Sequence, residues 1–286
     1  MCLVALAIEP RRAARADEDP IVFALAANRD EVLARPTAPL AAWSDAPNVY
    51  GGRDLDKGGT WLGVRTDGRF ALVTNYRDFR RAKPTAPPSR GALTADFLRG
   101  DEPVESLLAR LEREGDRFEP YNLVVGDLGA RRLHWHSNVG GAPRALGKGH
   151  VHGLSNALLD TPWPKVRSLT TTLDHLLAST PTPYGARSPE GVVELVAEER
   201  LSSFERASIE ALASRELAPV ESLPDTGVPP DVERALSSAF VALPGYGTRC
   251  SSVLTLTRGG RLSFVERTYD AFGVPLATRL VELTLR

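Results

Sequence analysis

Residues 2–8 read Cys-Leu-Val-Ala-Leu-Ala-Ile, and residues 21–27 read Ile-Val-Phe-Ala-Leu-Ala-Ala. Both runs are apolar throughout, and their length favours strands that are buried on both faces over helices. We expect the two strands to pair in the interior of a sheet. Four polar residues, Asn28-Arg29-Asp30-Glu31, follow the second run, where its strand is predicted to end.

Further strands and helices follow from the spacing of apolar residues. Glycine-containing turns between apolar segments predict hairpins centred on residues 66–68, 128–130 and 259–260, and a last strand is predicted at 279–285. Apolar residues at helical spacing predict helices at residues 91–97, 103–114, 163–178 and 202–216. Strand groups at both ends with helices between them predict one α+β domain over residues 1–286, with helices layered on sheets.

The composition excludes several classes of function. With 35 Lys and Arg against 36 Asp and Glu, the chain lacks the clustered excess of cations that nucleic-acid binding or a polybasic membrane contact needs. No apolar run approaches the roughly 18 to 20 residues of a membrane span, and no basic segment precedes the apolar start, as it would in a secretory signal. Cys2 and Cys250 cannot make a disulfide framework. The sequence predicts a cytoplasmic protein and leaves its oligomeric state unspecified.

Cys2 directly follows the initiator methionine. Because Cys2 is small, we expect Met1 to be removed, which leaves a thiol and a free α-amine on one residue. The α-amine has an ordinary pKa of about 7.7 to 8.0, so it can act as a base near neutral pH and activate its own thiol. The alternative is that Cys2 packs as a small apolar residue of the first strand.

Histidines and glycines carry alternative interpretations. His134 with His136, and His150 with His152, are each spaced to face one side of a strand, as ligands of a metal ion would be. No cysteine or acidic ligand stands beside them at a recognised spacing, which favours exposed strand histidines and no metal. The glycine pair at residues 51–52 matches no phosphate-binding motif and indicates a turn, so no cofactor is predicted.

A set of arginines has two interpretations. The set is Arg53, Arg77, Arg80, Arg81 and Arg90. It either surrounds the mouth of a site for an anionic ligand, which arginine binds through paired hydrogen bonds, or forms a solvated surface, which is the interpretation that the sequence favours. Cys250, at the start of a predicted strand, is interpreted as a small buried residue.

The tetrapeptide Asn28-Arg29-Asp30-Glu31 resembles the signature of the NRDE family, also called the transport and Golgi organisation protein 2 family. Further segments resemble the family in the same order and over nearly the whole chain. They are Gly58-Gly59-Thr60-Trp61-Leu62-Gly63, Thr74-Asn75-Tyr76-Arg77, Ser89-Arg90-Gly91, Tyr121-Asn122-Leu123, Gly153-Leu154-Ser155-Asn156-Ala157, Thr161-Pro162-Trp163 and Tyr246-Gly247-Thr248-Arg249.

The chain also resembles, more distantly, the cysteine N-terminal-nucleophile hydrolases, such as penicillin V acylase and bile salt hydrolase. This resemblance implies a four-layer αββα sandwich that hydrolyses non-peptide C–N amide bonds. The catalytic residues that it implies are Cys2, Asp30, Asn75, Asn156 and Arg249, and the substrate-binding residues predicted beside them are Asn28, Arg29, Arg77 and Arg90. The acylases have an arginine three residues before the aspartate, where this chain has Ala27. Arg29 or Arg249 would then supply the guanidinium beside the thiol.

Two functions are compatible with these residues. In the first, Cys2 attacks an amide carbonyl after removal of Met1, Asp30 orients the α-amine, and Asn75 and Asn156 donate hydrogen bonds to the oxyanion. In the second, a non-catalytic relative binds an amphipathic or hydrophobic ligand (lipid, acyl-CoA or haem), as the family resemblance implies. Each site residue also has a structural alternative, such as an ion pair between Asp30 and Arg29 or asparagines that shape turns.

Overall fold

The two apolar runs at the start of the chain pair as antiparallel strands in the computed structural model, which describes residues 2–11, 19–179 and 189–285. They are β1 (Cys2–Ile8) and β2 (Ile21–Val32), with Cys2 opposite Arg29. Successive side chains of a strand point to opposite faces. The even-numbered residues of β1 join one hydrophobic cluster and the odd-numbered residues join another, so both faces are covered and the run is apolar throughout.

Two antiparallel sheets contain the described strands. Besides β1 and β2, the first sheet consists of β10 (Val151–Leu154), β11 (Glu194–Leu195), β12 (Ala242–Leu243), β13 (Tyr246–Thr257), β14 (Arg261–Tyr269) and β15 (Pro275–Thr284). The second consists of β3 (Thr37–Trp43), β4 (Ala46–Asp54), β5 (Leu62–Arg65), β6 (Arg69–Asn75), β7 (Tyr121–Asp127), β8 (Arg132–Ser137) and β9 (Arg144–Ala145). The first has the order β10-β1-β2-β13-β14-β15-β11, with β12 beside β13, and the second follows chain order.

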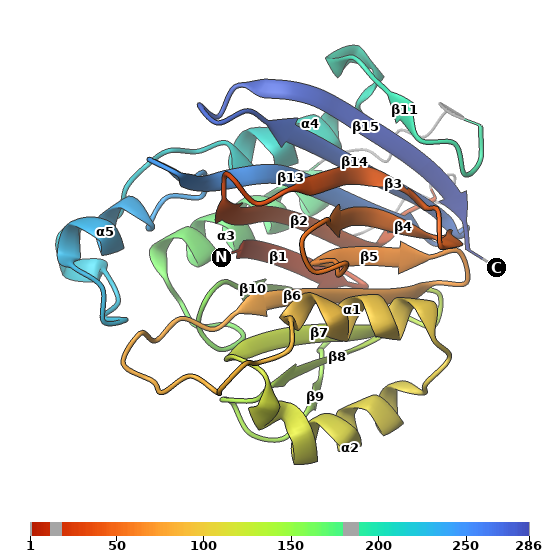
Figure 1. Cartoon of the computed structure of the whole chain (residues 1–286). Helices are drawn as coiled ribbons and strands as arrows, with labels where there is room; N and C mark the ends of the chain where they lie inside the picture. The colour runs from red at the N-terminus through yellow and green to blue at the C-terminus, as the bar shows by residue number, and fades with distance from the viewer. Residues whose placement is uncertain (1, 12–18, 180–188, 286) are drawn as a thin grey trace.

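Helices cover the outer face of each sheet. On the second sheet lie α1 (Arg90–Arg99) and α2 (Val104–Glu114), and on the first lie α3 (Pro164–Ser179) and α4 (Ser203–Leu212). The shorter helices are α5 (Pro230–Ala235), η1 (Gly115–Arg117), η2 (Glu198–Arg200) and η3 (Val220–Ser222). Figure 1 shows this arrangement, which confirms the predicted α+β class and the αββα order of layers. Among the described helices, none is long and apolar enough to cross a membrane.

Most predicted elements are confirmed, and the differences have physical causes. The hairpins β5–β6, β7–β8 and β13–β14 form as expected. Helix α4 begins after Ser202, whose side chain and that of Glu205 make a capping box, but it ends at Leu212, earlier than predicted. A turn was predicted at Gly51 and Gly52, but both glycines lie within β4. A Cβ atom on Gly51 would lie 2.6 Å from the main-chain oxygen of Leu62 in the neighbouring strand, so the glycine permits close pairing.

A close approach of two glycines joins α1 to the second sheet. A Cβ atom on Gly59 would lie 2.5 Å from the carbonyl carbon of Gly91, so this contact requires a residue without a side chain. The N–H of Thr60 donates to the carbonyl oxygen of Gly91, and the Thr94 hydroxyl donates to the carbonyl oxygen of Thr60. The contact holds the start of α1, and with it Arg90, at one end of the two sheets.

Candidate active site

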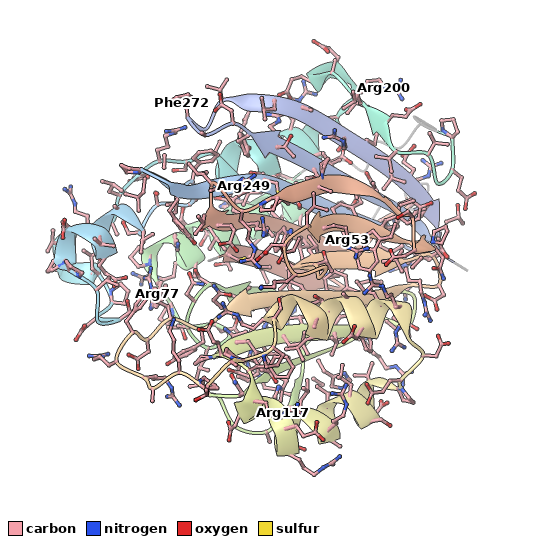
Figure 2. All side chains as sticks on the ribbon, viewed as in Figure 1. Arg53, Arg77, Arg117, Arg200, Arg249 and Phe272 are labelled. Atoms are coloured by element: carbon pink, nitrogen blue, oxygen red, sulfur yellow. The ribbon has the colours of Figure 1, made fainter. Side chains whose placement is uncertain are left out.

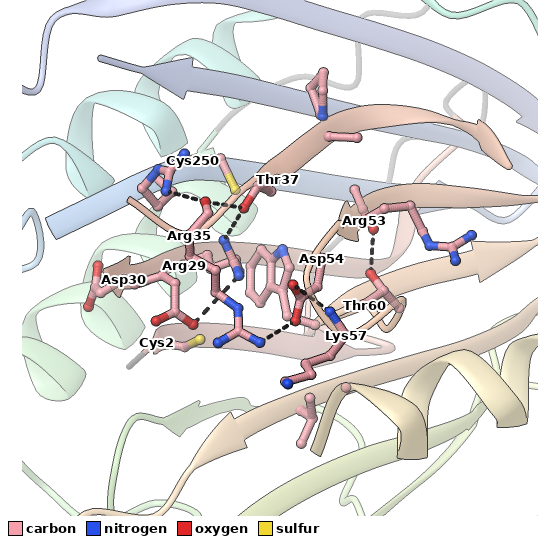
Figure 3. A pocket seen from close by; sticks show the side chains of 18 of the residues that line it. Cys2, Arg29, Asp30, Arg35, Thr37, Arg53, Asp54, Lys57, Thr60 and Cys250 are labelled. Carbon is pink, nitrogen blue, oxygen red and sulfur yellow. Dashed lines mark hydrogen bonds and ion pairs between the residues drawn. The ribbon is translucent and has the colours of Figure 1, made fainter. Parts of the chain in front are cut away.

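A cavity of about 730 Å³ opens where the ends of the two sheets face each other. Six of the nine predicted site residues line it. They are Cys2 of β1, Arg29 and Asp30 of β2, Asn75 of β6, Arg90 of α1 and Arg249 of β13. Figure 3 shows Cys2, Arg29 and Asp30 side by side at the ends of β1 and β2. The structure therefore brings together side chains from distant parts of the sequence around the thiol.

Cys2 presents a buried thiol to this cavity. Its carbonyl oxygen accepts a 2.9 Å hydrogen bond from the Ser155 hydroxyl. Burial raises the pKa of the Cys2 thiol to about 11; the charge of Asp30 raises it further, whereas the guanidinium of Arg29 opposes the shift. Met1, whose removal the proposed chemistry needs, lies outside the described residues.

Two hydroxyl groups hold Asp30, which lines the cavity, in place. The Thr248 hydroxyl donates a 2.7 Å hydrogen bond to its Oδ1 atom, and the Tyr246 hydroxyl donates to its carbonyl oxygen. Burial raises the pKa of Asp30, while the charge of Lys165 and the hydrogen bond from Thr248 lower it. The carboxyl group is thus one whose ionisation depends on the cations around it.

The two predicted oxyanion donors, Asn75 and Asn156, are in contact, but only Asn75 lines the cavity. Asn75 lies at the end of β6 and lines the cavity, and among the described residues its recorded hydrogen bonds use main-chain atoms. The Nδ2 atom of Asn156 donates a 3.0 Å hydrogen bond to the carbonyl oxygen of Asn75. Asn156 does not line the cavity but bonds to the main chain of Asn75, which does.

Arg29 and Arg249 were the two candidates for a guanidinium near the thiol. Arg29 pairs with Cys2 in the sheet register, and its charge lowers the thiol pKa. The Nη1 atom of Arg249 donates to the main-chain oxygens of Val32, Leu33 and Arg35, which fixes the chain that leaves β2. Of these two arginines, Arg29 is therefore the one whose charge favours the Cys2 thiolate.

Arg77 and Asn28 lie outside this cavity. The Arg77 guanidinium forms a buried ion pair with Glu233 of α5 and lies over the Trp163 ring, and Figure 2 shows Arg77 toward α5, away from Arg53 and Arg249. The Nδ2 atom of Asn28 donates to the carbonyl oxygens of Leu212 and Ala239, on the helix-covered face of β2. Both contacts are internal to the fold.

The sequence model described as "Transport and Golgi organisation 2" matches residues 1–271 of the chain. The chain belongs to this family. The transport and Golgi organization protein 2 homolog of Bos taurus is 31% identical over 282 residues, which cover 93% of this chain and 92% of the relative. The Homo sapiens homolog is 28% identical over 302 residues, which cover 100% of both chains.

Two solved structures are similar at low sequence identity. The Caenorhabditis elegans ortholog of N-acylethanolamine-hydrolyzing acid amidase is 11% identical, with a TM-score of 0.42 over 88% of this chain and 92% of that chain. The C2A mutant of the conjugated bile acid hydrolase from Clostridium perfringens is 11% identical, with a TM-score of 0.41 over 93% of this chain and 89% of that chain.

In this member of the transport and Golgi organisation 2 family, the sequence interpretation missed two buried residues that line the cavity and a buried lysine of α3. Cys250 is buried as predicted, but it also lines the cavity, and Arg29 lies between it and Cys2 in the register of neighbouring strands. Glu266 lies beside Cys250 and accepts a hydrogen bond from the N–H of Leu40. Lys165 is buried because it stands on the apolar face of α3, four residues before Leu169. A lysine on that face was a detectable signal.

The histidines do not form the exposed set that the sequence favoured. His136 and His152 are buried, with ring nitrogens bonded to the Tyr121 hydroxyl and to Asp160. Their partners explain the burial, because a buried polar group costs free energy unless it is hydrogen-bonded. No group of three or more His, Cys, Asp or Glu in the described ranges could hold a metal ion.

The arginine set is divided between the cavity and the surface. Arg53 and Arg90 line the cavity, and each also pairs with a carboxylate, Asp45 and Glu119. Arg80 is exposed and pairs with Asp225. The five arginines therefore do not form a single mouth.

In protein that retains Met1, we expect iodoacetamide to alkylate Cys2 slowly at neutral pH and at a rate that keeps rising to about pH 10. Only the thiolate reacts, and the pKa of about 11 leaves little thiolate at lower pH. Peptide mass spectrometry separates Cys2 from Cys250, whose pKa burial also raises and which serves as an internal reference. A Cys2 rate that levels off by about pH 8 would contradict a buried, protonated thiol.

Proposed function

We propose that the chain, once Met1 is removed, is a cysteine N-terminal-nucleophile amidohydrolase that acts on non-peptide C–N amide bonds of small molecules. One observation carries the proposal: the first residue of the first strand opens its thiol into a cavity shared with Asp30 and Asn75, which come from two different sheets. A nucleophile, an orienting carboxylate and an amide donor are the groups that acyl transfer needs.

In the first half of the reaction, the Cys2 Sγ atom attacks the amide carbonyl carbon. The α-amine of Cys2 takes the thiol proton and then gives it to the leaving nitrogen, so the products of this step are a free amine and a thioester on Cys2. The side-chain N–H of Asn75 donates to the oxyanion of the tetrahedral intermediate, a contact whose loss typically costs about 3 to 4 kcal/mol of barrier. Arg29 supports the thiolate.

In the second half, water attacks the thioester carbon with the same α-amine as its base. The C–S bond breaks, the α-amine returns the proton to the Cys2 Sγ atom, and the carboxylic acid leaves. Asp30 orients the α-amine through both halves, as the third member of a triad orients its base. This role suits Asp30 because the Thr248 hydroxyl already fixes one of its oxygens.

The test is hydrolysis by protein of known N-terminus. Purified protein is separated by intact mass into forms with and without Met1, and each is incubated with N-acyl amides of fluorogenic amines that differ in acyl length. Amine release by the processed form alone, with an acyl adduct on its N-terminal peptide, supports the proposal. A processed form that neither releases amine nor carries an adduct contradicts it.

A second candidate is binding of an amphipathic or hydrophobic ligand without turnover, such as a lipid, an acyl-CoA or haem. The size of the cavity, about 730 Å³, lies in the range of small-molecule sites, and its lining combines Trp61, Val73 and Leu276 with charged side chains. With Met1 in place, the Cys2 nitrogen is part of an amide, and its lone pair is delocalised into the carbonyl group, so it cannot act as a base. Retention of a ligand through purification, with no amine release by either form, would favour this candidate.

A further inference from the structure

A smaller cavity of about 200 Å³ adjoins the candidate active site. Cys2 lines the larger cavity, and some described residues line both. The shared residues are Glu31, Asn75, Arg90 and Glu119. Glu119 pairs with Arg90 of α1 at 3.2 Å and with Lys83 of the segment after β6 at 3.1 Å. An ion-paired cluster therefore lies where the two cavities meet.

Aromatic rings form part of the wall of the smaller cavity. Tyr76 and Phe79 belong to the segment after β6, and Tyr246 is the first residue of β13. The fold holds this segment, because the N–H of Tyr76 donates to the carbonyl oxygen of Pro120 and that of Phe79 to the carbonyl oxygen of Thr226. Phe79 is nevertheless 59% exposed, so much of its surface is free to contact a ligand.

Most of the charged side chains that line the smaller cavity are engaged in ion pairs. The pairs are Arg77 with Glu233, Asp78 with Arg80, Lys83 with Glu119, and Arg90 with Glu119. Arg81 is exposed. A charged group on a ligand would compete with these pairs, whereas a flat apolar ring would stack on the aromatic side chains and leave the pairs intact.

The proposed chemistry places the reacting carbonyl where the two cavities meet, because Asn75, its proposed oxyanion donor, lines both. The carbonyl carbon carries the acyl chain on one side and the leaving nitrogen on the other. That nitrogen needs a proton from the α-amine of Cys2, which Asp30 orients. Tyr246 of the smaller cavity donates to the carbonyl oxygen of Asp30. Figure 1 shows the start of β1 and the segment after β6 at the same end of the molecule.

We propose that the smaller cavity receives the amine part of the substrate, that this amine carries an aromatic ring, and that the larger cavity receives the acyl chain. The inference rests on the proposed function, because it names the substrate class of the same site. The volumes agree with it. A cavity of about 150 Å³ can hold benzene, so about 200 Å³ suits a single ring, and about 730 Å³ leaves room for an acyl chain.

The first measurement is kcat/KM of the processed form on octanoyl amides of 2-phenylethylamine, hexylamine and glycine. The wild-type protein should prefer the 2-phenylethylamide to the hexylamide at least about fivefold, because the ring stacks on aromatic side chains. Phe79→Ser should lower this preference at least about threefold. An equal loss for all three amides would overturn the inference. So would a preference for the glycine amide, whose carboxylate would pair with a cation such as Arg81.

The matched control is Leu276→Ser. Leu276 is 66% exposed and lines the larger cavity, so both substitutions replace an exposed apolar residue and should leave the fold intact. Leu276→Ser should reduce the gain in kcat/KM from butanoyl to octanoyl amides and keep the preference among amines. Phe79→Ser should do the reverse. If Phe79→Ser alters the dependence on acyl length and not on the amine, the assignment of the two cavities is wrong.

The second measurement needs no turnover. It is calorimetric binding of N-acetyl-2-phenylethylamine and N-hexylacetamide, both neutral, to Cys2→Ala protein. The aromatic amide should bind at least about threefold more tightly, and adding Phe79→Ser should remove the difference while adding Leu276→Ser keeps it. Equal affinities, or no binding of either amide, would overturn the inference. If the wild-type protein hydrolyses no amide, the proposed function fails, and the binding data still decide which group the smaller cavity prefers.

Discussion

Cys2→Ala is expected to lower amide hydrolysis by the processed form at least about 1,000-fold, since the substitution removes the nucleophile and leaves only binding and the oxyanion donor. The fold should not change, because Cys2 is a small residue at the end of a buried strand and alanine fits the same space. The measurement is kcat/KM with the fluorogenic amides, together with a thermal unfolding curve of each variant.

The chain offers a matched control for this experiment in Cys250→Ala. Cys250 is also buried, lines the same cavity and lies on the opposite side of Arg29, but its main-chain nitrogen is part of an internal peptide bond. It therefore has no α-amine to act as its base, and Cys250→Ala should keep hydrolysis within about threefold of the wild type. Comparable losses in both variants would indicate a general effect on the cavity instead of nucleophilic catalysis by Cys2.

Glu233→Gln is expected to destabilise the protein by about 3 to 5 kcal/mol, because it removes the negative member of a buried ion pair with Arg77. Glutamine has the same shape and can keep the 2.6 Å hydrogen bond that Thr226 donates to the other carboxylate oxygen, so the loss reports on charge. A change of this size should lower Tm by roughly 6 to 15 °C.

The comparison for Glu233→Gln is an ion pair at the surface. Asp225 pairs with Arg80, and its side chain is 81% exposed, so water screens the interaction. Asp225→Asn should leave Tm unchanged within the error of the scan. If Glu233→Gln also unfolds at the wild-type temperature, the pair with Arg77 does not contribute to stability.

The second strand shows where the sequence was informative and where it was not. The apolar runs predicted β1 and the start of β2, because both faces of these strands are buried. The strand was predicted to end at the four polar residues 28–31, but they continue β2, and β13 pairs with this strand as far as Val32. The partners that make this possible, such as Thr248 for Asp30 and Leu212 for Asn28, come from distant segments that local sequence does not identify.

The same extension of β2 explains why Arg29 lies beside Cys2 and Asn28 does not. Once the strand continues, Asn28 and Arg29 point to opposite faces. Arg29 lies opposite Cys2, whereas Asn28 donates to Leu212 and Ala239 on the helix-covered face.

The position of β1 has a consequence for a chain from which Met1 has been removed. A chain end normally frays, because its first residues have few neighbours and gain entropy by moving. Here the strand that begins at Cys2 lies between β2 and β10, and the Ser155 hydroxyl holds the Cys2 carbonyl. A terminus created at Cys2 would start inside a sheet and would already be immobilised. The entropic cost of aligning the terminal amine with a substrate would therefore arise during folding and would not recur at every turnover.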